Sequence, residues 1–133
     1  MLRSVLAKDY MSANLVTFTP HMDVLNAIQV LVDHRISGAP VVDETGNVVG
    51  VLSQKDCLRV ALEASYHGEW GGRVSEFMSR NAKTVEAETS ILEVAEMFMQ
   101  DEYRRYPVME ENRLIGQISR HDVLRALTTL RGA

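Results

Sequence analysis

A serine and an aspartate stand three residues apart in the stretch GVLSQKD, which runs from Gly50 to Asp56. The stretch lies where a pattern of strand residues gives way to a helical pattern. Ser-x-x-Asp before an apolar run is a variant of the capping box, in which the acid accepts from a free backbone N–H at the start of a helix. The same two side chains could instead hold a ligand. Taken alone, the stretch favours the cap.

A second copy of this pattern changes its meaning. GQISRHDVLRAL begins at Gly116 and matches the first stretch in its Gly, Ser, Asp, Leu and Arg residues, each displaced by 66 positions. Earlier in the chain the displacement is 67, as for Met11 and Met78 or Pro40 and Pro107. One residue is therefore lost between Pro and Gly, where polar residues 43–47 correspond to 110–113. Turns tolerate such a change best, so we predict a hairpin in both halves.

The elements around these motifs follow the same order in both halves. Short strands are expected at 15–18 and 83–85, each before an amphipathic helix with apolar residues at helical spacing, over 24–32 and 92–99. Two strands around the hairpin turn follow, at 39–43 and 47–53 and at 106–110 and 113–119. Helices are expected over 56–65 and 122–130. Each half thus reads β-α-β-β-α, and because a half of about 60 residues buries little surface alone, the halves should pack together.

Composition excludes several classes of function. The chain has 133 residues, 46% of them hydrophobic, and a net charge of −4 with acids and bases interspersed, so it lacks the basic stripe needed to bind nucleic acid. No apolar run approaches the length of a membrane span. The single Cys57 and a charged N-terminal stretch that does not resemble a signal peptide predict a cytoplasmic, reducing location.

The sequence resembles a tandem pair of cystathionine β-synthase (CBS) domains, also called a Bateman module. The resemblance rests on the two Gly, Ser, Asp motifs, on HRISGAPVVDETGNVVG and EYRRYPVMEENRLIG before them, and on YMSANLVTF and FMSRNAKTV. It implies an α+β fold of two β-α-β-β-α repeats packed with pseudo-two-fold symmetry. We expect repeat 1 at 1–66, a connector at 67–72 and repeat 2 at 73–133.

The same resemblance implies ligands and their residues. Members of this family bind AMP, ADP, ATP or S-adenosylmethionine in clefts to which both repeats contribute. Carried over by position, one composite site consists of Ser119, His121, Asp122, Thr17, Ile36, Ser37 and Gly38. The other consists of Ser53, Lys55, Asp56, Thr84, Tyr103, Arg104 and Arg105.

The chemistry of these side chains fits such ligands. An aspartate offers only acceptors and can receive both hydroxyls of a ribose, while the serine and the free N–H groups of the first helical turn suit a phosphate. Cations at positions 55, 104 and 105 make the second site the more suitable for phosphate; the alternative for the Arg pair is a solvated helix end. Gly50 and Gly116 fit either close approach of a ligand or a bulge or tight strand crossing.

Other reactive residue types carry no predicted role. The four histidines have no metal-ligand spacing with Cys57 or with each other, so we predict no metal site, and Ser119, His121 and Asp122 are too close in one helix start to form a catalytic triad. Cys57 corresponds to Val123 and is expected to be a small buried residue.

We therefore predict a non-catalytic, homodimeric regulatory module that binds an adenine nucleotide as a regulatory ligand, requires no cofactor and signals to a separate effector protein. The alternative is a dimerisation or protein-interaction adaptor without a ligand. Dimerisation is expected through the helices that follow the two motifs, because they carry more apolar residues than one buried face requires.

Overall fold

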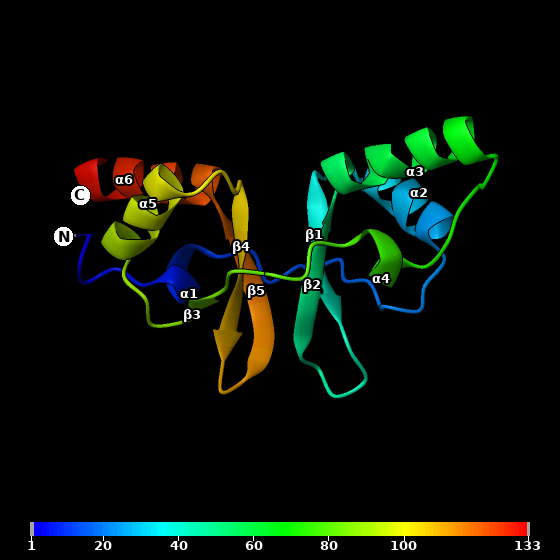
Figure 1. Cartoon of the computed structure of the whole chain (residues 1–133). Coiled ribbons are helices and arrows are strands. Elements are labelled where there is room, and N and C mark those ends of the chain that lie inside the picture. The colour runs from blue at the N-terminus through cyan, green and yellow to red at the C-terminus, as the bar shows by residue number, and fades with distance from the viewer. Residues whose placement is uncertain (1, 133) are drawn as a thin grey trace. The chain divides into compact units, whose positions relative to one another are not determined.

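The computed structural model describes residues 2–132, which form two compact units (Figure 1). Unit 2 is Val16–Ala82, and unit 1 combines residues 2–15 with 83–132. The elements of unit 2 are α2 (Val24–His34), β1 (Gly38–Val42), β2 (Val48–Ser53), α3 (Gln54–His67) and α4 (Val74–Phe77). Those of unit 1 are α1 (Ala7–Tyr10), β3 (Val85–Glu86), α5 (Ile91–Gln100), β4 (Arg105–Glu110), β5 (Arg113–Ser119) and α6 (Arg120–Gly132).

The packing units do not coincide with the sequence repeats expected at 1–66 and 73–133. Residues 7–15 and 74–82, here called the leading segments, begin the two repeats. Each leading segment packs in the unit that contains the rest of the other repeat. Each unit is therefore assembled from both repeats, and the chain passes between the units at 15–16 and again at 82–83.

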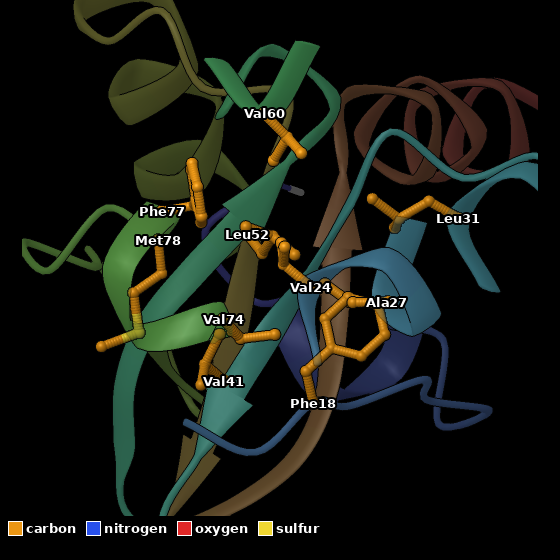
Figure 2. Close-up of a cluster of buried hydrophobic side chains, with 11 residues drawn as sticks. Phe18, Val24, Ala27, Leu31, Val41, Leu52, Val60, Val74, Phe77 and Met78 are labelled. Atoms are coloured by element: carbon orange, nitrogen blue, oxygen red, sulfur yellow. The ribbon is translucent and has the colours of Figure 1, made fainter. Parts of the chain in front are cut away.

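In unit 2, helices α2 and α3 pack beside the antiparallel β1–β2 hairpin. The register places Gly38 opposite Ser53, and a bulge follows Val41. The apolar faces of the helices and strands form one core, in which Val24 and Leu52 are fully buried (Figure 2). Burial of a side chain of this size contributes about 1.5–3 kcal/mol.

In unit 1, β3 pairs parallel with β4, which pairs antiparallel with β5. Helices α5 and α6 lie side by side next to this sheet (Figure 1). Ser90 caps α5 by accepting from the backbone N–H of Glu93 at 3.1 Å. The core includes the fully buried Tyr106, whose hydroxyl donates a hydrogen bond to the Asp101 carboxylate.

Both predicted hairpins and all four predicted helices are present. The strand expected at 15–18 is wrong: outside the named strands, only Phe18 of this stretch forms a bridge, parallel to Val41. The short helices α1 and α4 were not predicted, because four residues are too few to show a helical period.

Candidate functional site

The Ser53–Asp56 motif is a helix cap in unit 2. The Asp56 backbone N–H donates to Ser53 Oγ at 3.1 Å, and the Ser53 backbone N–H donates to Asp56 Oδ2 at 2.9 Å. These reciprocal bonds satisfy backbone donors at the start of α3 that have no partner within the helix. The capping prediction is confirmed, and the cap also holds one carboxylate oxygen in a fixed place.

A third donor reaches this carboxylate from a leading segment. The Ser79 hydroxyl lies 3.2 Å from Asp56 Oδ1 and 3.4 Å from Oδ2. Ser79 is held there because it exchanges two backbone hydrogen bonds of 2.9 Å with Val51 of β2. The motif of repeat 1 therefore contacts the leading segment of repeat 2. Ser79 was not predicted as a site residue, although its match to Ser12 in the other repeat was a signal.

The segment before β1 lies at the same end of unit 2. The Gln54 backbone N–H donates to the Ser37 carbonyl at 2.8 Å, and the Gln54 side-chain amide donates to the Ile36 carbonyl at 3.0 Å. The first residues of α3 thus hold Ile36 and Ser37 beside Ser53. Unit 2 also contains the exposed side chains of Thr17 and Lys55.

The motif of unit 1 repeats the cap with an added bond. Asp122 Oδ2 accepts from the Ser119 backbone N–H at 2.9 Å and from the Ser119 hydroxyl at 3.0 Å, while the Asp122 N–H donates to Ser119 Oγ at 3.2 Å. The Arg120 N–H donates to the Arg104 carbonyl at 3.3 Å, as Gln54 does to Ser37. His121 is exposed at this helix start.

An arginine in each motif helix holds a leading segment. Arg59 donates to the carbonyls of Glu76 and Phe77 at 3.2 and 3.0 Å, with its guanidinium 4.9 Å from the centre of the Phe77 ring. In unit 1, Arg125 donates to the Tyr10 carbonyl at 3.1 Å and lies 5.3 Å from the Tyr10 ring centre. The sequence contained the signal, a matching Arg in both repeats, but not its role.

Because of Arg125, the carboxylates of Asp56 and Asp122 have different electrostatic surroundings. It approaches Asp122 Oδ1 at 3.5 Å, whereas the corresponding oxygen of Asp56 has a neutral hydroxyl beside it. The two motifs have the same backbone geometry but different charge around the carboxylate.

Arg105 lies within unit 1 directly opposite Ser119 in the β4–β5 pair. Residues directly opposite each other in an antiparallel pair have neighbouring side chains. Burial lowers the pKa of Arg105, and the charge of Asp122 partly offsets that shift. Its Nε is buried, and the Nε–H group donates a hydrogen bond to none of the described residues. Arg105, which the sequence assigns to the Asp56 site, thus also interacts electrostatically with Asp122.

The remaining predicted residues of unit 1 cluster at the start of β3 and β4. Thr84 directly precedes β3, and Tyr103 and Arg104 directly precede β4. Thr84 is half-buried, whereas Tyr103 and Arg104 are exposed. Each predicted composite site draws on residues of both units, so its assembly stays a prediction.

Both motif glycines are needed by the chain itself. A Cβ on Gly50 would lie 2.7 Å from the Ser79 carbonyl oxygen, and one on Gly116 would lie 2.8 Å from that of Ser12. Each glycine also adjoins the bulge of its hairpin. The sequence left open whether these glycines allow close approach of a ligand or a bulge or tight strand crossing. The close approach seen here is between two segments of the chain, as in a strand crossing.

Cys57 behaves as a packed side chain. Burial, with a further contribution from the Asp56 charge, raises the pKa of its thiol to about 11. A thiol with this pKa is a poor nucleophile at neutral pH, since the thiolate is the reactive form. In the described part of the chain, His, Cys, Asp and Glu side chains form no group suited to a metal ion.

The family model of the CBS domain matches twice, over residues 7–63 and 74–129. The chain belongs to the CBS-domain family. CBS-pair structures share its mixed helix and strand fold with two repeats, which confirms the predicted fold class.

Three solved or curated proteins illustrate the similarity. A crystal structure of CBSX2 in complex with AMP is 27% identical, covers 96% of this chain and 98% of its own, and superimposes with a TM-score of 0.84. The CBS domain-containing protein YhcV of Bacillus subtilis is 27% identical over 87% of this chain and 81% of its own length. The 5'-AMP-activated protein kinase subunit gamma-3 of Sus scrofa is 31% identical over 78% of this chain.

This CBS pair spans only part of several relatives. It covers 21% of the pig kinase subunit and 42% of the protein MJ1225 of Methanocaldococcus jannaschii. Among the described residues, no helix is both long and apolar enough to cross a membrane.

Proposed function

We propose that this chain is a cytoplasmic, non-catalytic regulatory module that binds an adenosine-containing ligand, AMP, ADP, ATP or S-adenosylmethionine, and signals to a separate effector protein. The observation that carries the proposal is the pair of reciprocal Ser–Asp caps. Each cap fixes an aspartate at the start of a long helix, where its carboxylate can accept ribose hydroxyls and the nearby N–H groups suit a phosphate.

The relatives support an adenosine ligand. CBSX2 has been crystallised with AMP, and a CBS pair of protein MJ0100, 25% identical, with 5-methylthioadenosine and S-adenosyl-L-methionine. We propose the fourteen predicted residues as the nucleotide ligands, grouped into the two composite sites given above. Ser79 joins the Asp56 group because its hydroxyl touches that carboxylate.

Calorimetric titration with adenosine, AMP, ATP and S-adenosylmethionine tests the proposal, with GTP as a control. The informative variants are Asp56→Asn and Asp122→Asn, because asparagine keeps one oxygen to accept from the serine N–H and so preserves the cap. Loss of charge-assisted bonds to ribose costs about 1.5–3 kcal/mol, so each variant should bind roughly 10- to 150-fold more weakly at its site.

Arg105→Ala distinguishes phosphate from ribose recognition. If Arg105 contacts phosphate, its loss weakens ATP more than AMP and leaves adenosine nearly unchanged. Equal losses for all three ligands would show that this arginine has a structural role beside Asp122.

The second candidate function is a ligand-free adaptor. It gains support if none of these ligands binds or raises the melting temperature at millimolar concentration.

We further propose that the module is a homodimer joined through α3 and α6. Four leucines of these helices remain half or more exposed: Leu58 at 66%, Leu62 at 51%, Leu124 at 59% and Leu127 at 50%. Apolar side chains gathered on a helix mark an interaction surface. Sedimentation should show a species of twice 14.9 kDa, and Leu58→Glu should dissociate it; a wild-type monomer at micromolar concentration would contradict the dimer.

A further inference from the structure

Unit 1 contains a polar network centred on Asp101, the residue that follows α5. Asp101 Oδ2 accepts from Lys83 Nζ at 2.9 Å and from the Tyr106 hydroxyl at 2.7 Å. The Asp101 side chain is 19% exposed and that of Lys83 46%. Both hydrogen bonds lower the pKa of Asp101, and the bond from Lys83 has the larger effect. We call Lys83, Asp101 and Tyr106 the Asp101 network.

The network joins three segments that are separate in sequence. Lys83 lies before β3, Asp101 directly follows α5, and Tyr106 belongs to β4. Tyr106 is fully buried, and the centre of its ring lies 4.6 Å from that of Phe98. This packing holds the Tyr106 hydroxyl in one position. A partly buried carboxylate that receives two donors from rigid neighbours holds all three segments in one arrangement.

Three of the four proposed nucleotide ligands of unit 1 outside the motif, Thr84, Tyr103 and Arg105, adjoin or contact a network member. Thr84 follows Lys83 in sequence, and Arg105 precedes Tyr106. The Tyr103 ring makes an edge contact with the Tyr106 ring at 5.9 Å between centres. The network therefore connects directly to residues proposed as nucleotide ligands, among them Arg105, which is proposed to contact phosphate.

Unit 2 has no equivalent of this network. The residues 67 positions earlier are Val16, His34 and Ala39, and neither valine nor alanine can donate a side-chain hydrogen bond. His34 instead bonds to the Val30 carbonyl of its own helix at 3.0 Å. The network is thus a specific addition to one of two otherwise similar units.

We propose that the Asp101 network is a positioning device that holds Thr84 and residues 103–105 in their nucleotide-binding arrangement before the ligand arrives. The inference rests on the proposed nucleotide-binding function and assigns positioning roles to Lys83, Asp101 and Tyr106. Its physical basis is preorganisation: side chains ordered in advance lose less conformational entropy on binding. Two adjacent arginines gain most, because their side chains are long and their charges repel.

Tyr106→Phe is the decisive variant, because it removes one hydroxyl, keeps the buried ring and changes no charge. We expect about a 5- to 20-fold weaker affinity for AMP and a smaller loss for adenosine, since ordering of the arginines matters only to phosphate. Lys83→Met is a second variant should Tyr106→Phe fold poorly. Lys83→Arg keeps the ion pair and should bind AMP almost as wild type does.

A matched control exists in the same unit. Lys8 and Glu88 form another Lys–acid pair, with 3.9 Å between Nζ and Oε1, and both side chains are exposed. Lys8→Met removes one positive charge, as Lys83→Met does, so it reports the general effect of charge on AMP binding. We expect its affinity to change less than twofold.

Calorimetry with adenosine and AMP, and hydrogen exchange of the ligand-free protein, give separate readouts. In Tyr106→Phe, exchange at residues 101–105 should become faster while α6 stays protected. If the wild type binds AMP and Tyr106→Phe binds it equally well, or if Lys83→Arg is no better than Lys83→Met, the positioning role is wrong and the nucleotide site stands. If the wild type binds no adenosine ligand, both proposals are overturned.

Discussion

The Ser79 hydroxyl lies 3.2 Å from Oδ1 of Asp56, although the two residues belong to different repeats. The contact places the leading segment of repeat 2 on the carboxylate proposed to bind ribose. A change at this carboxylate therefore acts directly on residues 74–82, which end where the chain passes from unit 2 to unit 1.

A double-mutant cycle with Ser79→Ala and Asp56→Ala should detect this contact, because each single variant removes it; the loss of the cap in Asp56→Ala cancels within the cycle. We expect a coupling free energy of about 0.5–1 kcal/mol in urea unfolding, at the low end for a hydrogen bond because Ser79 is exposed. The matched pair is Ser12→Ala with Asp122→Ala, where the bonds to the carboxylate come from Ser119 and Arg125. Equal coupling in both cycles would contradict the assigned contact.

Replacing Gly50 by alanine should destabilise unit 2. The added Cβ would lie 2.7 Å from the Ser79 carbonyl oxygen and 2.8 Å from Met78 Sδ, both closer than normal van der Waals contact. Overpacking of this kind costs about 1–3 kcal/mol. Adding Met78→Ala removes only the sulfur contact, so it should not restore stability; a full rescue in thermal unfolding would place the strain on the flexible side chain instead.

Arg59→Lys should weaken the attachment of α4. Lysine keeps the charge but cannot bond to two carbonyls with a planar group that also lies over Phe77. We expect a loss of about 1–2 kcal/mol in the free energy of unfolding, and faster hydrogen exchange in residues 74–78. Lys55→Ala on the exposed start of the same helix serves as the control and should change stability by less than about 0.5 kcal/mol.

The internal repeat made the helices, the hairpins and the capping motifs predictable from the sequence. Ser-x-x-Asp specifies a cap through local geometry, and the one-residue difference between repeats identified the turn at 43–47. Local pattern was sufficient because the donors and acceptors lie within three or four residues of each other.

The exchange of leading segments was not predictable in the same way. Nothing in residues 74–82 indicates that they pack beside β2 and α3, because that choice depends on long-range contacts such as those of Ser79 with Val51. The same holds for Lys83, Asp101 and Tyr106, whose side chains meet from three segments. Their residue types gave no periodic signal, and their counterparts in the other repeat are of different types.

Asp101 should make the stability of unit 1 depend on pH in acid. The hydrogen bond from Lys83, and after it the bond from Tyr106, lowers the pKa of Asp101 below the ordinary value of an aspartate in the folded protein. A carboxyl group whose folded pKa is depressed stabilises the protein above its unfolded pKa, and that stabilisation is lost as the pH falls through the folded value. The free energy of unfolding of the wild type should therefore exceed that of Asp101→Asn near pH 7, and the difference should shrink below about pH 4.

The double variant Lys83→Met with Tyr106→Phe removes both causes of the shift, so adding Asp101→Asn to it should produce little further pH dependence. Urea unfolding from pH 7 to pH 2 measures these differences, and a wild-type advantage that stays constant over this range would show that Asp101 does not titrate with a lowered pKa in the folded protein.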